Sequence, residues 1–264
     1  MISMRPRLPT ELLDWISNLL HDDGQDALKA YCLVSKAWIY RARRHLFKCI
    51  HFQSYKLFGM WKTKFPDPVN SPAIHTRSLF INHAEEFTDA DVSWIQSFTE
   101  VVQLEVTAFR DYDPNGRPAF SPFHGLSSTV KSLGVVWFGW QSRDVLDFIC
   151  SFPNLVDLQV EGSGQIRNRC GDWAISGFPP STRSILLETS TTEFMHQLLD
   201  LPIHFPFEEI VWKGTFESDF RVVLELVAKC SDVLARIELD LRRSTESFPS
   251  TPTISSVSIC SSSG

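Results

Sequence analysis

The chain has 264 residues, of which 43% are hydrophobic and 12% aromatic, and its formal net charge is −6. This apolar content excludes wholesale disorder, and the length accommodates a small module followed by a larger domain. Residues 1–50 hold eight Lys/Arg against five Asp/Glu, a charge of +3 that leaves −9 for the remainder, and neither value indicates a nucleic-acid-binding protein.

The first fifty residues predict three short helices that carry more large apolar side chains than they can bury against one another. Leu12, Ile16 and Leu19 follow one stripe of the first helix, and the later helices add residues of the same kind, among them Trp38. A unit of about forty residues is below the size at which one hydrophobic core usually suffices. We therefore expect its spare apolar surface to be a docking face.

Three strings in this region, LPTELLDWISNLL, DALKAYCLVSKAW and RHLF, agree in order and spacing with one known module. They resemble an F-box, through which substrate receptors attach to the Skp-type adaptor of cullin–RING ubiquitin ligases. The resemblance implies a three-helix unit over residues 5–55. It also implies that the adaptor is contacted by Leu8, Pro9, Leu12, Ile16, Leu28, Val34 and Trp38, with Leu46 and Phe47 completing the packed end of the unit. A plain helical cap on the following domain is the alternative.

A basic cluster lies at the third predicted helix. Its members are Arg41, Arg43, Arg44, His45 and Lys48. Because polar residues face outward there, we interpret the cluster as a solvated helix face rather than as a nucleic-acid-binding patch.

The six cysteines are widely scattered, and no two of them form a CxxC pair. No secretory apolar region precedes them, and no apolar run approaches the roughly eighteen residues of a membrane span. We therefore expect reduced thiols, a cytoplasmic or nuclear location and no contact with a membrane.

Beyond a Pro-containing connector at 56–75, the chain repeats a pattern of apolar, two residues, apolar, one residue, apolar. The middle positions are 79, 104, 133, 158, 185, 210 and 237, with steps of 25, 29, 25, 27, 25 and 27. Segments with helical spacing lie between the copies, so each unit is predicted to contain a strand and a helix. Such a unit cannot bury its own apolar side, whereas stacked units share a continuous core. The sequence therefore predicts an α/β fold with a parallel sheet over residues 76–243.

This pattern resembles a degenerate leucine-rich repeat, which implies an irregular α/β solenoid. The resemblance has a clear departure, because the turn position that normally holds Asn or Cys holds other residues here. These residues are Ala84, Phe109, Phe138, Ser163, Ser190, Thr215 and Arg242. The turns must therefore be satisfied in another way. A short α/β sheet domain without superhelical closure is the alternative.

One face of the predicted sheet is rich in carboxylates. In each strand, the side chains that do not enter the core point to a common surface. This surface holds seven acidic residues, including Asp240, and two basic ones, Lys213 and Arg236. We therefore expect it to bind a basic segment of a protein substrate. The acidic residues predicted to contact the substrate are Glu105, Asp157, Glu161, Glu188, Glu209 and Glu238.

Other motifs do not favour catalysis or metal binding. The stretch 111–116 copies the first half of a calcium loop, but Pro122 occupies the twelfth position, where a bidentate Glu is required. His45, Cys49 and His51 fall short of a complete ligand set. Because the sequence also lacks a recognisable nucleophile–base pair, we expect no cofactor, no metal and no enzymatic activity.

Together these features predict a non-catalytic substrate receptor. The F-box would bind the Skp-type adaptor and, through it, cullin and RING subunits, while the repeat domain would hold an unidentified protein substrate. The alternatives are a ligase-independent scaffold that pairs with the adaptor only, and an enzyme with a cleft between the two domains. Residues 244–264 hold twelve Ser/Thr and predict a disordered tail.

Overall fold

The computed structural model describes residues 12, 15–16, 25–34, 36–109, 120–138, 142–163, 177–188, 191–214, 217–241 and 257–260. The strands are β1 (Cys49–Phe52), β2 (Ser78–Ile81), β3 (Gln103–Phe109), β4 (Ser132–Phe138), β5 (Asp157–Ser163), β6 (Ser184–Glu188), β7 (Glu209–Gly214), β8 (Arg236–Leu241) and β9 (Val257–Cys260). The α-helices are α2 (Gln25–Val34), α3 (Lys36–Leu46), α4 (Tyr55–Lys64), α5 (Val92–Gln96), α6 (Ser142–Cys150), α7 (Thr192–Asp200) and α8 (Glu217–Lys229). Short 3-10 helices are η1 (Pro72–His75), η2 (Ala84–Glu86), η3 (Asp89–Asp91) and η5 (Ser121–Leu126).

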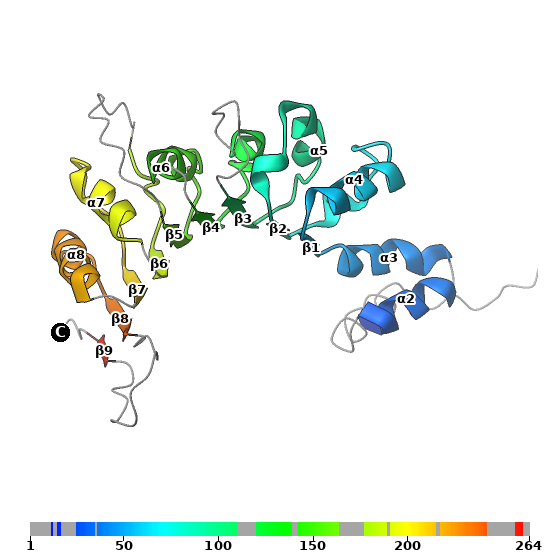
Figure 1. The fold of residues 1–264 in the computed structure, drawn as a ribbon. Helices are drawn as coiled ribbons and strands as arrows, with labels where there is room; N and C mark the ends of the chain where they lie inside the picture. Colours follow the sequence, from blue (N-terminus) through cyan, green and yellow to red (C-terminus); the bar gives the residue numbers. More distant parts are fainter. Residues whose placement is uncertain are drawn as a thin grey trace, which may run out of the picture.

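The strands in these ranges form one sheet whose spatial order is the order of the chain, from β1 to β9. Strands β1 to β8 run parallel, and β9 pairs antiparallel with β8. Figure 1 shows the strands following one another along an arc, with helices α4 to α8 on its outer side and α2 and α3 beyond the β1 end. The fold is therefore α/β with a largely parallel sheet, as the sequence predicts.

The register of the parallel strands matches the predicted repeat. The middle apolar residues of neighbouring strands stand opposite one another, from Leu79 beside Leu104 to Ile210 beside Ile237. Leu79, Leu104 and Leu133 are fully buried. The predicted register is confirmed, and burial explains it, because a shift by one residue would turn each of these side chains to the opposite face.

The sheet starts one strand earlier than predicted. Ile50 and Phe52 of β1 belong to the core, and β1 pairs with β2. Helix α4 covers this strand, with the rings of Phe52 and Phe58 in edge-to-face contact at 5.2 Å. The prediction placed β1 in the N-terminal unit and α4 in the connector. Phe47, Ile50 and Phe52 repeat the apolar spacing of the later strands, and this earlier copy was missed.

Three of the turn positions that lack Asn are strand residues, namely Phe109, Phe138 and Ser163. β3 and β4 extend through Phe109 and Phe138, whose rings stack with centroids 5.3 Å apart and an interplanar angle of 13°. At the equivalent position after β2, Ala84 is fully buried. In β3 and β4, a stacked aromatic pair therefore takes the place of a polar turn residue.

A buried ion pair ties helix α4 to η3. The side chain of Asp91 is 1% exposed and lies 2.5 Å from Lys62 Nζ. It also accepts hydrogen bonds from the Tyr55 hydroxyl at 3.2 Å and from the backbone N–H of Thr88 at 3.0 Å. Burial alone would raise the pKa of the Asp91 carboxyl, but these hydrogen bonds outweigh burial and leave the pKa lowered. The charged carboxylate thus fixes α4 on the helix side of the sheet.

Part of the C-terminal segment forms a strand. The prediction of a disordered tail over 244–264 is wrong for β9, where Ile259 lies beside Ile237 of β8. Val257 and Ile259 alternate with a serine and a cysteine, which is a strand pattern that the serine-rich composition obscured. In the described parts of the chain, none of the helices has both the length and the apolar character needed to cross a membrane.

Candidate functional site

The N-terminal helical region leaves large apolar side chains in contact with solvent. Leu12 is 45% exposed, Trp15 61% and Leu33 89%. Only Leu12 was among the predicted adaptor contacts. Trp15 and Leu33 directly precede Ile16 and Val34, two of the predicted adaptor contacts. These two exposed side chains were missed because the predicted contact positions lie one residue further along the chain. These three are exposed large apolar side chains among the described residues of the N-terminal region.

The other predicted adaptor contacts differ in their burial and in their location in the fold. Phe47 is half-buried and packs edge-to-face on Trp61 with ring centroids 5.8 Å apart, so it lies against the core of the sheet. Three predicted contacts are half-buried, namely Ile16, Trp38 and Leu46. Two lie on α2, namely Leu28 and Val34, and two fall outside the described residues, namely Leu8 and Pro9.

The six acidic residues predicted to bind a substrate all lie on the sheet face away from the core, where Asp157 is exposed and the other five are half-buried. The strand register places Asp157 and Glu209 on either side of Ser184. It also places Glu161 directly beside Glu188. The predicted acidic residues therefore share one continuous surface that crosses β3 to β8.

The two basic residues of this face are bonded to its acids. Lys213 Nζ lies 2.7 Å from a carboxylate oxygen of Glu188. The Arg236 guanidinium lies 2.8 Å from Glu209 and 2.9 Å from Glu238. Three of the six predicted acids, Glu188, Glu209 and Glu238, are thus paired with the two basic residues that the sequence also places on this face.

Negative charge at Asp157 is disfavoured by its surroundings, because the pKa of its carboxyl is raised. Burial raises the pKa of its carboxyl, and the neighbouring charge of Glu209 raises it further. Glu105, on β3, lies against Gly134, where an added Cβ would come within 3.0 Å of Glu105 Cγ. A cationic side chain from a partner would offset the repulsion between Asp157 and Glu209.

The end of the face nearest β1 is aromatic. The His51 and Phe80 rings lie 5.8 Å apart across β1 and β2. His83 lies 5.3 Å from the Phe109 ring, which in turn stacks on Phe138. Phe138 is 39% exposed. This ladder of rings offers an apolar contact surface next to the charged part of the sheet.

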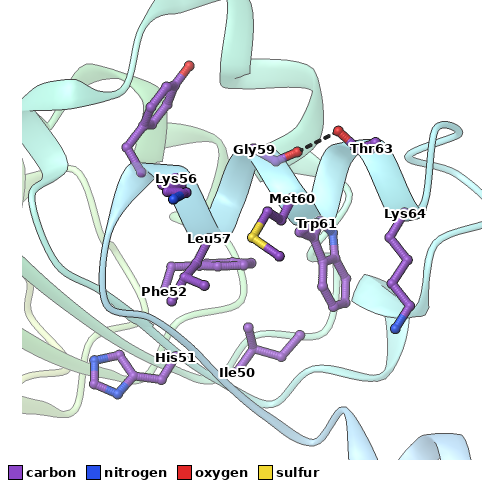
Figure 2. Close-up of a pocket in the computed structure, with 11 residues that line it drawn as sticks. Ile50, His51, Phe52, Lys56, Leu57, Gly59, Met60, Trp61, Thr63 and Lys64 are labelled. Carbon is purple, nitrogen blue, oxygen red and sulfur yellow. Dashed lines mark hydrogen bonds between the residues drawn. The ribbon is translucent and has the colours of Figure 1, made fainter.

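An apolar groove of about 860 Å³ lies between β1 and α4. Figure 2 shows Leu57, Met60 and Trp61 of the helix lining it together with the strand. Two exposed lysines, Lys56 and Lys64, also line it. Strand β1 has a strand neighbour on one side only among the described residues. The groove spans the end of the predicted F-box and the start of the predicted connector, and none of the predicted site residues lines it.

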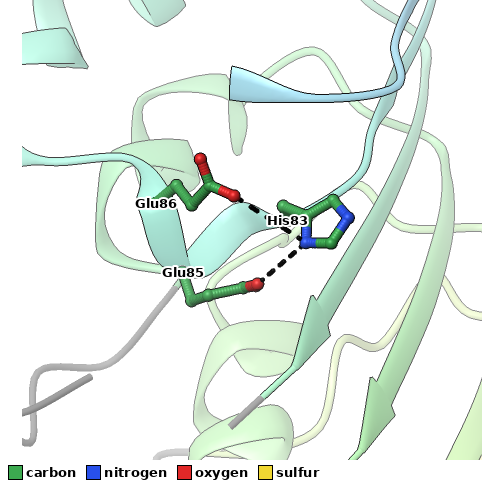
Figure 3. A group of neighbouring side chains, drawn as sticks. All are labelled: His83, Glu85 and Glu86. Atoms are coloured by element: carbon green, nitrogen blue, oxygen red, sulfur yellow. Dashed lines mark hydrogen bonds and ion pairs between the residues drawn. The ribbon is translucent and has the colours of Figure 1, made fainter. Parts of the chain in front are cut away.

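Three ligand-type side chains meet in the turn after β2. His83 Nδ1 lies 3.2 Å from Glu85 Oε1 and 3.9 Å from Glu86 Oε1 (Figure 3). The Glu85 side chain is 2% exposed, and its second oxygen accepts a hydrogen bond from the backbone N–H of Phe109 at 3.0 Å. Both oxygens of Glu85 are therefore engaged within the protein, and they hold the η2 turn against the end of β3.

The groups of possible metal ligands differ in whether the structure brings their ligand atoms together. Among the described residues, His83, Glu85 and Glu86 are the group whose ligand atoms lie close enough, within 4.8 Å of one another, to hold an ion. His45, Cys49 and His51, which fall short of a complete ligand set in the sequence, are not a group of this kind among the described residues. The calcium-like stretch 111–116 lies outside the described residues.

Comparisons of the chain with protein-family models, with curated proteins and with solved structures find no significant match. Functional conclusions therefore depend on the residues and surfaces described above.

Proposed function

We propose that this chain is a non-catalytic substrate-receptor subunit of an SCF-type cullin–RING ubiquitin ligase. Its N-terminal helices would bind the Skp-type adaptor, and the open face of its sheet would hold a protein substrate. The observation that carries the proposal is the solvent exposure of Leu12, Trp15 and Leu33 in a region whose sequence resembles an F-box. Large apolar side chains gathered in one small region are typical of a surface that another protein covers.

The sheet supports the second half of the proposal. Parallel strands that follow one another in chain order, with helices on the outer side of the arc, fit an irregular leucine-rich-repeat-like solenoid. Such arrays use an extended sheet face for binding. Here that face offers exposed aromatic rings at one end and carboxylates at the other, a combination suited to a peptide with apolar and basic residues.

The chain would perform no chemistry itself. Its contribution would be to hold a substrate lysine near a charged conjugating enzyme that other subunits bring, which raises the effective concentration of the two reactants. The cysteines at 32, 49, 150 and 230 are free thiols. Burial raises the pKa of Cys150 and of Cys230 to about 12, so these two thiols stay protonated. Free thiols are compatible with the cytoplasmic or nuclear location that the proposal requires.

The test is capture of a Skp-type adaptor and a cullin by the co-expressed full chain. Exchanging Leu12 and Leu33 for Ala should reduce adaptor capture at least about tenfold. Apolar side chains that a partner buries at the centre of an interface typically contribute more than about 1.4 kcal/mol to binding. Leu224 on α8 is 47% exposed, so Leu224→Ala is the matched control and should leave capture unchanged. Unaltered capture by the double variant would contradict the proposal.

The same experiment separates the proposal from the scaffold alternative. A ligase subunit retains the cullin together with the adaptor, whereas a scaffold that only pairs with the adaptor does not. Affinity capture with and without proteasome inhibition, followed by mass spectrometry, then identifies substrates as proteins that accumulate only when degradation is blocked.

A further inference from the structure

The first strand of the sheet has an open edge. Among the described residues, β1 pairs with β2 on one side and with no strand on the other. The carbonyl of Lys48 accepts a hydrogen bond from the first backbone N–H of β2 at 3.0 Å, and the carbonyl of Phe52 accepts one from the residue after β2 at 2.9 Å. Backbone groups of successive residues alternate in direction across a parallel ladder, so those of Cys49 and His51 point to the open edge.

The groove between β1 and α4 lies beside this edge. Ile50 of the strand and Trp61 of the helix line it, and two more lining side chains, Leu57 and Met60, are 39% and 59% exposed. Its volume of about 860 Å³ has room for large apolar side chains. One partner could therefore form backbone hydrogen bonds with the strand and place an apolar anchor in the groove.

The rim of the groove is positively charged. Lys56 and Lys64 are exposed, and none of the described lining residues is a carboxylate. Lys64 Nζ lies 5.8 Å from the centre of the Phe65 ring, a contact that leaves its charge in place. Figure 2 shows the two lysines toward opposite ends of the helix, with Leu57 and Met60 between them. A segment with acidic residues on either side of an apolar one complements this arrangement.

The spacing of the two lysines fits an extended segment. Lys56 and Lys64 are eight positions apart on α4, which corresponds to about 12 Å along the helix axis. A strand covers about 13 Å in four residues and points every second side chain to the same face. A segment laid along β1 would thus bring its side chains i and i+4 to the two lysines and side chain i+2 to the apolar part between them.

Other occupants complement this surface less well. Pairing of two copies of the chain through β1 would bring the lysines of both α4 helices to one interface, where like charges repel. The chain's own residues 1–11 hold two arginines and one glutamate, so their net charge has the same sign as the rim. Charge therefore favours an acidic segment of a different protein.

We propose that the open edge of β1 and the groove beside it bind an extended acidic segment of another protein, which adds a strand to the sheet. The segment has the pattern acidic, any residue, apolar, any residue, acidic. Its backbone pairs with Cys49 and His51, and its apolar side chain packs on Met60. The inference does not depend on the ligase proposal, because the groove lies on the helix side of the sheet and none of the predicted adaptor contacts lines it.

The direct test is binding of a labelled peptide, Thr-Glu-Thr-Leu-Thr-Glu-Thr with both ends blocked, to the full chain at physiological salt. Fluorescence anisotropy should show saturable binding. The same peptide with Lys in place of both Glu should bind at least about tenfold more weakly, because two attractions become repulsions. The isomer Thr-Thr-Glu-Glu-Thr-Leu-Thr keeps the charge but loses the spacing, and it should also bind more weakly.

Variants of the chain locate the site. Lys64→Glu should weaken binding about fivefold, whereas Lys131→Glu makes the same charge change at an exposed lysine outside the groove and should leave binding unchanged. Met60→Glu should weaken binding at least about tenfold, because it places a carboxylate where the apolar anchor packs. Leu224→Glu, on α8, is its matched control. Circular dichroism checks that each variant retains the fold.

Strand addition has a readout of its own in backbone hydrogen exchange. The peptide should slow exchange at the N–H groups of Cys49 and His51, which point to the open edge. Exchange at Ile50 and Phe52 should change little, because their N–H groups point to β2. Exchange followed residue by residue by NMR measures the difference.

Four results would overturn the proposal. Absence of saturable binding would leave the edge without this partner, and equal affinities of the Glu and Lys peptides would show that the rim does not select charge. Equal affinities of the wild-type chain and Met60→Glu would place the peptide elsewhere. Unchanged exchange at Cys49 and His51 in the saturated complex would exclude strand addition. Met60→Glu should leave adaptor capture unchanged, so the outcome is separate from that of the ligase proposal.

Discussion

The open face of the sheet differs between its two ends. The aromatic half, on β1 to β4, exposes the rings of His51, Phe80, Phe109 and Phe138, whereas the charged half, on β5 to β8, carries paired acidic and basic residues. Both halves share one strand register and one core. The comparison shows that a repeated backbone sets where side chains point but leaves the chemistry of the surface to each strand. A partner that spans the whole face would need apolar residues at one end and basic residues at the other.

The largest expected effect on the free energy of unfolding concerns Asp91, which holds helix α4 beside the aromatic half. Asp91→Ala should lower the free energy of unfolding by about 2–3 kcal/mol at neutral pH, because it leaves Lys62 without its carboxylate and removes the acceptor for Tyr55. Denaturant unfolding monitored by tryptophan fluorescence measures the loss. A loss below about 0.5 kcal/mol would show that the ion pair does not hold α4 in place.

The same network predicts a dependence on acid. The folded-state pKa of Asp91 is lowered below the usual range of an aspartate, so its stabilising contribution is present above that range and is lost as pH falls through the folded-state pKa. Unfolding free energies measured from pH 6 downward should therefore fall less steeply in Asp91→Asn than in the wild-type chain. Parallel curves for the two proteins would contradict the assignment.

The ladder of rings should make the next largest contribution to the free energy of unfolding. Phe138→Ala should cost about 1 kcal/mol of stability, because it removes the stacking partner of Phe109. Phe138→Tyr keeps the ring and is the matched control, with stability close to wild type. The same pair of variants sharpens the comparison of the two halves, since Phe138→Ala should also weaken substrate capture if the aromatic half contacts the substrate.

The charged half should respond more weakly to the loss of an ion pair. Lys213→Ala should cost about 0.5–1 kcal/mol, because its partner Glu188 is only partly buried and water replaces part of the interaction. A double-mutant cycle with Glu188→Ala isolates the pair. If Lys213→Ala costs as much in the Glu188→Ala background as in the wild type, the ion pair contributes nothing.

The smallest effect should have the opposite sign. Asp157→Asn should raise stability by a few tenths of a kcal/mol at neutral pH, because it removes a carboxylate whose pKa is raised by burial and by Glu209. The raised pKa means that this penalty exists above the folded-state pKa and disappears as pH falls through it. Destabilisation by the substitution would show that Asp157 is favourably paired, and the charged half would then lack a preferred position for a basic residue.

Local patterns were sufficient to predict the strands but not their limits. The spacing around Leu79, Leu104 and the later middle positions predicted the parallel register, because burial of every second side chain constrains a strand strongly. The strand at Ile50 and Phe52 was missed, since it has four residues and only two others separate it from the end of a helix. β9 was missed because a serine-rich composition hid the alternation of Val257 and Ile259.

The candidate surfaces were predicted only in part. The outward position of the acidic residues follows from alternation along each strand, and the structure places all six on the expected face. Their pairing with Lys213 and Arg236 depends on which strands become neighbours and on how long side chains reach across them. The groove beside α4 depends on the packing of that helix on β1, which no spacing in the sequence indicated.

By itself, the sequence determined the α/β class, the strand register and the direction of most strand side chains, because these follow from periodicities of a few residues. Only the tertiary structure decided which charges meet. It paired Lys213 with Glu188 and Arg236 with Glu209, and it set Lys56 and Lys64 beside one apolar groove. Electrostatic interactions fall off with distance in space rather than along the chain, so they are settled only when distant segments pack together.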